Sequence, residues 1–284
     1  MARPIGPCIG VDLRDDGARV VVTEADKGVV DVRQTLARAD AAAIAEACGV
    51  LMARGRRRPQ GIGLAIRDRT FDAAADFARV IARATGLPCR VAGAGTCALM
   101  TVFAQGSWRG RRDVALLSLG EALHVGIWLN GKPLHANGRD PDVDHWPLDP
   151  AGERCPCGGR GCAHTLLGPT ALARTAALAH LPASAGQGGA DLAGRAEAGD
   201  PMARAVLQRM ADQAALLARG LVAAYGITTL ALHWPTAAQH GVVTELLRAT
   251  VARQLPGLAE LRIAASDANS IAQGAARWAM RRTP

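Results

Sequence analysis

Four residues that could bind one metal ion lie within the stretch DHWPLDPAGERCPCGGRGCAH at residues 144–164. They are His145, Cys155, Cys157 and Cys162, which offer one imidazole and three thiolates. Soft thiolates with one imidazole suit tetrahedral zinc, and four protein ligands leave no open position for a catalytic water. Three glycines between Cys157 and Cys162 would let the backbone turn tightly enough for the sulfurs to meet one ion. The stretch therefore predicts a structural Zn²⁺ site.

The alternative for these cysteines is a disulfide in a secreted protein, and the rest of the sequence argues against it. Neighbouring cysteines of a C-x-C pair bridge poorly. The N-terminal MARPIGPCIGVDL lacks a long apolar region, and no run approaches the roughly 18 to 20 apolar residues that span a bilayer. The remaining cysteines stand singly among mostly apolar neighbours, as buried thiols do: Cys8, Cys48, Cys89 and Cys97. We expect a cytoplasmic protein without a membrane partner.

Composition describes a globular chain of 284 residues that is long enough for two packed lobes, with 49% hydrophobic and 20% charged residues. The 33 basic and 25 acidic residues give a net charge of +8. Arginines cluster at 54–58, 109–112 and 281–282. A basic surface can attract nucleic acid, but the clusters fall at expected turns and at the chain end, and no reading motif accompanies them. We therefore interpret them as solvated faces and do not expect nucleic acid as a partner.

Hydrophobic periodicity and turn residues predict alternating strands and helices that would position the metal stretch. Strands are expected at 8–13, 18–23, 61–66, 113–119, 227–232 and 260–264. Helices are expected at 37–52, 71–85, 167–181, 236–254 and 266–280, with two more in 190–225 that break near Gly199-Asp200-Pro201. This order predicts an α/β protein of mixed sheets flanked by helices.

The spacing H-x9-C-x-C-G-x-x-G-C resembles the zinc signature of the ROK family, which comprises bacterial sugar kinases and sugar-responsive repressors. The resemblance extends along the whole order of strands and helices, and Gly274-Ala275-Ala276 is similar to the family's terminal G-A-A. It implies a two-lobed actin-like ATPase (ribonuclease H-like) fold of ROK type with a structural zinc loop. We expect an N-terminal lobe at 1–112 completed by a C-terminal helix at 266–284, and a C-terminal lobe at 113–265 carrying the zinc loop 144–164.

The chain departs from the family in the segment that carries the chemistry. RVAGAGTCALM at 90–100 aligns with the family's V-x-N-D-A-N-x-x-A-L. Gly93 then replaces the Asn that holds sugar hydroxyls, and Ala94 replaces the Asp that acts as general base. No Asp or Glu occurs from Arg90 through Arg112. A positioned base contributes about a hundred- to ten-thousandfold, and alanine cannot accept a proton. The alignment therefore assigns no catalytic residue.

Three stretches that correspond to the family's nucleotide loops are altered as well. The D-x-G-G-T turn is replaced by residues 12–16, which keep only the leading Asp12, and the second loop keeps Gly120 but places Glu121 after it. A carboxylate about 4 Å from a phosphate charge costs on the order of 4 kcal/mol at an effective dielectric near 20. After the strand at 227–232, His233 and Trp234 stand where the family has a glycine-rich turn. These changes argue against binding of ATP with Mg²⁺.

The resemblance places a sugar-binding set beside the zinc ligands. Asp142 and His164 occupy the places of two sugar-binding glutamates, and His145 corresponds to a histidine that contacts sugar while fixed by the metal. These side chains keep hydrogen-bonding ability, so one interpretation is a retained site for a sugar-like ligand. The other is that all three shield the zinc, with Asp142 or Asp144 accepting from an imidazole N–H.

Two main hypotheses follow. In the first, the chain is a catalytically impaired ROK protein, a pseudokinase that works as a ligand-binding or regulatory module. In the second, it is an ATP-dependent sugar kinase, similar to glucokinase or N-acetylhexosamine kinase, in which Asp142, Asp144 or Asp12 replaces the missing base. A non-kinase enzyme using Asp142, His145 and His164 as acid and base remains a third class, although no spacing specifies its reaction. The resemblance also implies a homo-oligomer, such as a dimer.

Overall fold

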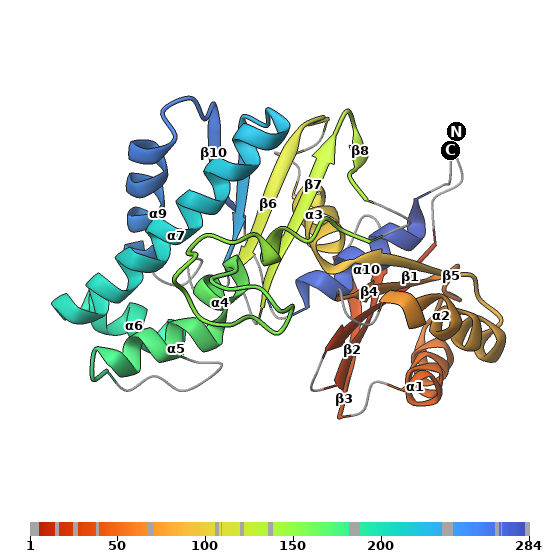
Figure 1. Cartoon of the computed structure of the whole chain (residues 1–284). Helices are drawn as coiled ribbons and strands as arrows, with labels where there is room; N and C mark the ends of the chain where they lie inside the picture. Colours follow the sequence, from red (N-terminus) through yellow and green to blue (C-terminus); the bar gives the residue numbers. More distant parts are fainter. Residues whose placement is uncertain are drawn as a thin grey trace. The chain divides into compact units, whose positions relative to one another are not determined.

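The computed structural model describes residues 6–14, 17–24, 28–37, 40–67, 71–105, 108, 110–119, 122–135, 139–181, 188–234, 241–264, 267 and 269–281. The chain divides into two compact units (Figure 1). Unit 1 contains Met1–Gly110, Pro133–Pro141 and Asp267–Pro284, and unit 2 contains Arg111–Lys132 and Asp142–Ser266.

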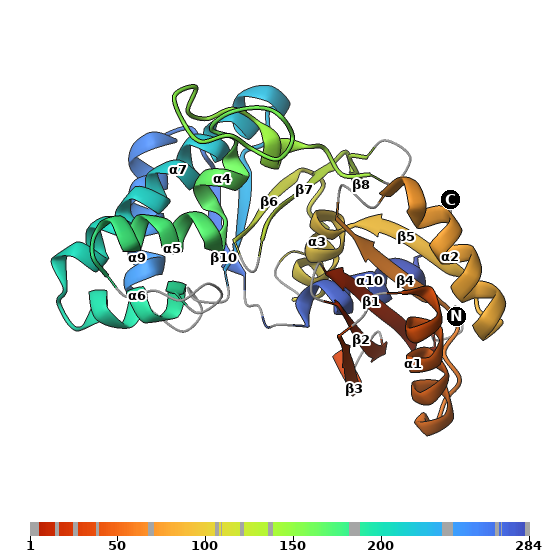
Figure 2. The same ribbon diagram turned by 60° about the horizontal axis from the view of Figure 1, so that its bottom comes forward.

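Unit 1 is built on a five-stranded sheet with the order β3-β2-β1-β4-β5. Its strands are β1 (Cys8–Arg14), β2 (Gly17–Glu24), β3 (Gly28–Leu36), β4 (Ile62–Ile66) and β5 (Cys89–Gly93). Its helices are α1 (Ala41–Arg54), α2 (Phe71–Thr85), α3 (Ala94–Ala104) and α10 (Ser270–Met280). β1 pairs antiparallel with β2 and parallel with β4, and β4 pairs parallel with β5. Figure 2 shows α1 and α2 on one side of this sheet and α3 and α10 on the other.

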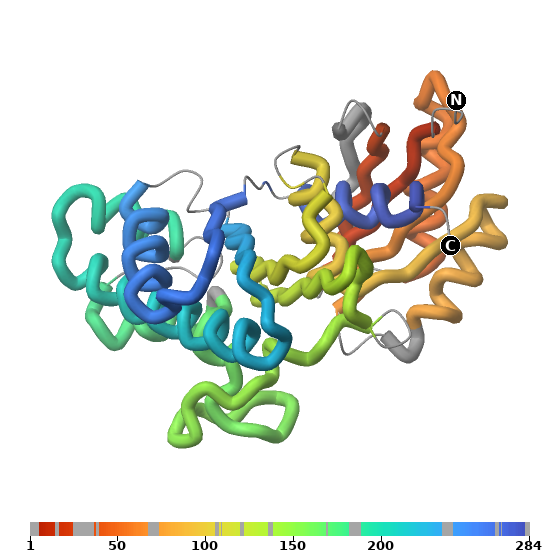
Figure 3. The backbone as a smooth tube through the Cα atoms, turned by 90° about the horizontal axis from the view of Figure 1, so that it is seen from above, coloured from red at the N-terminus to blue at the C-terminus, as the bar shows by residue number. Residues whose placement is uncertain are grey.

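The alternation of side chains along β1 and β4 separates the two faces of that sheet. Ile9, Val11 and Leu64 belong to one hydrophobic cluster with buried residues of α1 and α2. Between them, Gly10 and Gly63 face the backbone of α10 on the opposite side. The absence of side chains there lets α10 lie directly on the strands, alongside α3. In Figure 3, α10 is the blue helix nearest the C-terminal label.

Unit 2 has its own five-stranded sheet with the order β10-β9-β6-β7-β8. Its strands are β6 (Val114–Leu119), β7 (Leu123–Leu129), β8 (Lys132–Pro133), β9 (Thr229–His233) and β10 (Glu260–Ala264). Its helices are η2 (Val143–His145), α4 (Ala163–Leu167), α5 (Pro169–Leu178), α6 (Gly188–Glu197), α7 (Pro201–Tyr225) and α9 (Gly241–Gln254). β6 is central: it pairs antiparallel with β7 and parallel with β9, and all six of its residues are buried.

The structure contains strand structure that was not predicted, and some predicted helices have other bounds, such as the one expected at 266–280, which begins at Ser270. β3 was not predicted, and it pairs antiparallel with β2 through two register shifts. The helix predicted at 37–52 begins at Ala41, because the Asp40 side chain accepts the Ala43 N–H at 2.8 Å and caps the helix there. The helix predicted at 167–181 is interrupted at Gly168, where α4 ends and α5 begins with a proline at its first position. Within the described residues, no helix combines the length and hydropathy that crossing a bilayer requires.

Asp200 begins the longest helix and supplies a testable cap. Its carboxylate accepts the N–H groups of Ala203 and Met202 at 3.1 and 2.9 Å and pairs with Arg195. The Ala203 N–H is the main cause that lowers the pKa of Asp200 below its ordinary value of 3.8. A carboxyl whose folded pKa is lowered contributes stability above its unfolded pKa and loses it as pH falls through the folded pKa.

We therefore expect Asp200→Ala to lower the midpoint of thermal unfolding by a few degrees at neutral pH, since α7 loses its cap. Calorimetry at about pH 7 and about pH 3.5 should give a smaller difference between the two proteins in acid. A difference that grows on acidification would contradict this assignment.

Candidate metal centre

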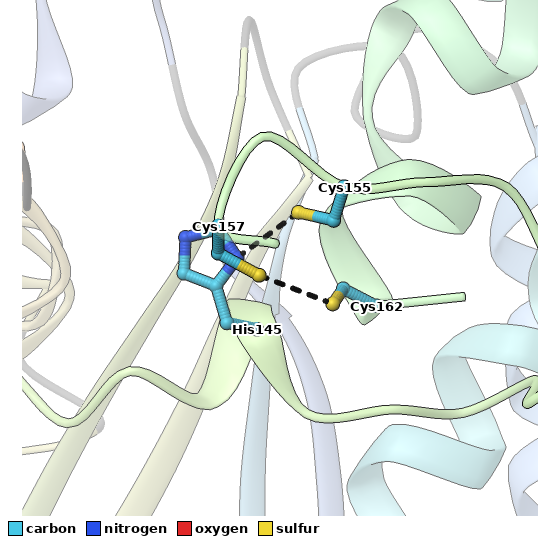
Figure 4. A group of neighbouring side chains, drawn as sticks. All are labelled: His145, Cys155, Cys157 and Cys162. Carbon is cyan, nitrogen blue, oxygen red and sulfur yellow. Dashed lines mark hydrogen bonds between the residues drawn. The ribbon is translucent and has the colours of Figure 1, made fainter. Parts of the chain in front are cut away.

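The four predicted metal ligands come together in unit 2. His145 ends the short helix η2, Cys155 and Cys157 lie in the following loop, and Cys162 is the N-cap of α4. Figure 4 shows the four side chains pointing toward one another. Their ligand atoms all lie within 4.8 Å of one another. Cys155 and Cys162 are buried, His145 is half-buried and Cys157 is exposed. The loop therefore presents one compact donor set with a single ligand open to solvent.

The distances suit a shared ion. His145 Nδ1 lies 3.3 Å from the Cys155 sulfur, and the sulfurs of Cys157 and Cys162 are 3.6 Å apart. An S–S bond measures about 2.05 Å, so this pair is not a disulfide. Tetrahedral zinc with Zn–S distances of about 2.3 Å would place two sulfur ligands roughly 3.8 Å apart. One imidazole and three sulfurs at these separations fit zinc, and Nδ1 is the imidazole atom that faces the sulfurs.

Glycine geometry makes this loop possible. Gly158 and Gly161 have φ angles of 95° and 55°, in the left-handed region that favours glycine. An ideal Cβ on Gly161 would lie 1.6 Å from the Asp149 carbonyl oxygen, so no other residue fits there. The Gly159 N–H donates to the Cys157 sulfur at 3.4 Å. The glycines predicted from sequence to allow a tight turn therefore also shape the space around the sulfurs.

Backbone hydrogen bonds hold the segments that carry the ligands. The Cys155 N–H donates to the Gly159 carbonyl at 2.8 Å, which closes the turn around Cys157. The Ala163 N–H donates to the Trp146 carbonyl at 2.9 Å, and Pro147 and Cys162 form an isolated bridge. His145 and Cys162 are therefore joined through their chain neighbours as well as through the donor set.

The Cys162 thiol is the donor whose ionisation a metal ion would favour most clearly. Burial, together with hydrogen bonds between its thiol and those of Cys157 and Cys155, raises the pKa of Cys162 to about 12. A thiol with that pKa keeps its proton at neutral pH, and only a thiolate is a good zinc ligand. A bound metal ion would displace the proton and stabilise the thiolate. The chemistry that zinc would supply here is structural, since these four ligands complete a tetrahedral shell.

The three predicted sugar-contact residues have different surroundings in unit 2. The His145 and His164 rings lie 5.8 Å apart, centroid to centroid. Asp144 Oδ2 is 3.7 Å from His145 Nε2, the imidazole nitrogen on the far side from Cys155. Burial raises the pKa of Asp144, and the nearby His145 opposes that effect. Asp142 is exposed at the start of η2. Asp144 is one of the two acceptors predicted for an imidazole N–H, and its 3.7 Å distance from His145 Nε2 is too long for a direct hydrogen bond.

The start of α3 in unit 1 contains a carboxylate that sequence reasoning missed. Gly93 is the N-cap and Ala94 the first residue of α3. The Asp140 carboxylate lies against them: Oδ2 accepts the Thr96 N–H at 3.0 Å, and Oδ1 accepts the Thr96 hydroxyl. Burial is the main cause that raises the pKa of Cys97 in α3, and the charges of Asp140 and Asp12 add to it. The only sequence signal for Asp140 is an acid shortly before Asp142.

The predicted nucleotide loops are only partly described. Residues 15 and 16 of the first loop and residues 120 and 121 of the second lie outside the described residues, so the predictions for Gly120 and Glu121 do too. Asp12 is 2% exposed in β1, opposite Arg19. In the third stretch, His233 is buried and its Nδ1 lies 2.7 Å from the Ser118 hydroxyl oxygen, and Trp234 is 5% exposed.

The two α/β units, each with a mixed five-stranded sheet, and the Cys3His loop define an actin-like ATPase fold with a candidate metal loop. The family model described as "ROK family" matches residues 30–282. The chain therefore belongs to the ROK family, as its zinc-loop spacing indicated. Among curated proteins, it is 36% identical over 62 residues to the DNA-binding transcriptional repressor Mlc of Escherichia coli (strain K12). That match spans 22% of this chain and only 15% of the repressor.

Solved structures show the same fold. A ROK hexokinase from Thermus thermophilus is 24% identical with a TM-score of 0.79, and the match covers 96% of this chain and 98% of that one. A ROK glucokinase from Streptomyces griseus, in complex with glucose and AMPPNP, is 21% identical with a TM-score of 0.76, covering 96% and 99%. A ROK transcriptional regulator homologous to the Escherichia coli MLC protein is 17% identical with a TM-score of 0.78, covering 95% and 77%. The fold thus serves kinases and regulators alike.

Proposed function

We propose that this chain is a ROK-family protein that has lost phosphoryl transfer and acts as a sugar-like ligand-binding or regulatory module. The observation that carries the proposal is the start of α3, where buried Ala94 presents only a methyl group. The family resemblance places the general base at this residue. Loss of a positioned base typically lowers the rate by about a hundred- to ten-thousandfold.

Bulky side chains at the nucleotide-facing stretches support the same proposal. His124 and Val125 lie on β7 where the resemblance places glycines, and Val125 is buried in unit 2. Trp234, also buried, follows β9 where the resemblance places a glycine-rich turn. Backbone amides approach phosphate oxygens closely where glycines leave room, and these side chains remove that room.

The retained metal loop suggests that the fold itself is needed. We propose that the ion is Zn²⁺, held by His145 and the three cysteines. Structural zinc contributes about 10 to 16 kcal/mol in small metal-binding peptides, so drift that destroyed the loop would be costly. We further propose that Asp142, His145 and His164 contact the hydroxyl groups of a sugar-like ligand from unit 2. Their hydrogen-bonding atoms and the 5.8 Å separation of the two imidazoles support a polar contact set.

The proposal also includes the assembly and compartment that the resemblance implies. We place the chain in the cytoplasm as a homo-oligomer, such as a dimer, with a small ligand and neither a membrane nor nucleic acid as partner. None of its seven cysteines, all of which the structure describes, forms a disulfide, and this suits a reducing compartment.

One observation favours the alternative, an active ATP-dependent sugar kinase with a relocated base. The Asp140 carboxylate lies at the start of α3, close to Ala94, where the family resemblance places the aspartate that acts as general base. Phosphoryl transfer depends chiefly on positioning and charge stabilisation, so a carboxylate arriving from another segment is a chemically reasonable substitute.

Calorimetric titration of the zinc-loaded protein with Mg-ATP tests the proposal, because nucleotide affinity reports on the altered loops without assuming a sugar. We expect no saturable heat at millimolar nucleotide and no ATP-dependent phosphorylation of glucose. A ROK glucokinase serves as the positive control in both measurements. Saturable binding together with phosphate transfer, abolished by Asp140→Asn, would establish the kinase alternative instead.

A further inference from the structure

The cap of α3 is unusual, because it comes from a different segment of the chain. The first N–H groups of a helix need acceptors, which an N-cap side chain ordinarily supplies. Gly93 is the N-cap of α3 and has no side chain to do so. Asp140 supplies the acceptor instead, since its Oδ2 receives the Thr96 N–H at 3.0 Å across 44 positions of sequence. Its second oxygen receives the Thr96 hydroxyl. Both oxygens of the carboxylate therefore have donors within unit 1.

The space around Gly93 shows why residue 93 lacks a side chain. An ideal Cβ on Gly93 would lie 2.2 Å from both Cγ and Oδ2 of Asp140, far inside van der Waals contact. The backbone gives no other reason, because Gly93 has φ −65° and ψ 153°, which any residue adopts. A side chain at 93 and the Asp140 carboxylate therefore cannot both occupy their present positions.

We propose that the Asp140 carboxylate fills the space beside the start of α3 that a side chain at residue 93 would otherwise take. In that space, a side chain at residue 93 would cap the helix and contact a ligand. The inference deepens the proposed function and rests on it. The residues at 93, 94 and 140 then depart from the family pattern together. Asp140 keeps α3 capped, and its carboxylate closes the space beside residue 93 to the hydroxyl group of a ligand. Restoring a carboxylate at residue 94 alone would leave Asp140 in place.

A double-mutant cycle tests the coupling without any assay of activity. Gly93→Asn should lower the unfolding midpoint of the zinc-loaded protein by about 3 to 8 °C, because the introduced side chain displaces Asp140 or distorts the turn. Asp140→Ala should lower it by a similar amount, because α3 loses its cap. The double variant should be no less stable than Asp140→Ala alone, since the introduced asparagine then caps α3 itself. The matched control is Asp113→Ala, which removes a carboxylate that accepts the Asn130 N–H in unit 2.

Additive losses in the Gly93/Asp140 cycle, equal to those of Gly93→Asn combined with Asp113→Ala, would overturn the proposal. A ligand arm follows with glucose as the probe. We expect the affinity for glucose, measured by calorimetric titration, to rise at least about tenfold when Asp140→Ala is combined with Gly93→Asn. Gly93→Asn alone should not raise it. Unchanged glucose affinity in the double variant would also contradict the proposal that Asp140 fills the space beside residue 93. Phosphorylation of glucose by the unmutated protein would refute the proposed function but leave the outcome of the stability cycle intact.

Discussion

Replacing Cys162 by serine is expected to abolish stoichiometric zinc binding and to destabilise unit 2 by about 3 kcal/mol or more. Cys162 is 1% exposed and lies 3.6 Å from the Cys157 sulfur, so its loss leaves three ligands around a buried gap. Outer partners of metal ligands cost about 10- to 100-fold in affinity when removed, and a direct ligand should cost more. Metal analysis after dialysis should give one zinc per unmutated chain and none per variant. Thermal unfolding should show a matching fall in the midpoint.

Cys89→Ser is the matched control for this change. Cys89 lies in β5 of unit 1, far from the donor set in sequence, and burial raises its pKa to about 12, as for Cys162. The control should retain one zinc per chain and lose little stability. A chelator should lower the midpoint of the unmutated protein to that of the Cys162 variant, because both remove the same ion. Equal zinc content in the unmutated protein and the Cys162 variant would contradict the Cys3His site.

The metal loop could be predicted because its information is local. All four donors lie within one short stretch, and the glycines that permit the turn stand between the ligands themselves. Ligand chemistry then selects among a small number of arrangements. The same locality made most strands and helices predictable, since their periodicity and terminating residues are encoded within each segment.

Features that depend on contacts distant in sequence could not be predicted in this way. Asp140 caps α3 from 44 positions away, and in sequence it is only one more acid before the metal loop. β3 has polar residues at several positions and pairs with β2 through two register shifts, so its pattern is weaker than that of the buried strands. Gly93 is the clearest case. The sequence shows only that a polar side chain of the family is missing there, whereas the structure shows that Gly93 makes room for the Asp140 carboxylate.

The second large expected effect is a loss of stability when one of the glycines between α10 and the sheet of unit 1 is replaced. Gly63→Ala is expected to destabilise unit 1 by more than about 3 kcal/mol. An ideal Cβ there would lie 1.8 Å from the Ala275 carbonyl oxygen, which belongs to the backbone of α10 and cannot rotate away as a side chain could. Gly10 meets the Ala272 carbonyl oxygen at 1.8 Å in the same way. Urea unfolding followed by tryptophan fluorescence, to which Trp278 in α10 contributes as one of five tryptophans, should report the loss.

Gly274 tests the packing of α10 against its other neighbour, α3, because its ideal Cβ would lie 1.7 Å from the Cys97 carbonyl oxygen. Gly274→Ala should therefore match Gly63→Ala in cost, although alanine ordinarily favours a helix by about 1 kcal/mol. Gly49→Ala in α1 is the control, since nothing lies within 4 Å of its ideal Cβ, and it should leave stability unchanged or improved. If all three alanines behaved alike, α10 would not be seated on backbone contacts. If only the control is tolerated, the G-A-A run near the chain end is a packing requirement of unit 1 and is needed whether or not the protein transfers phosphate.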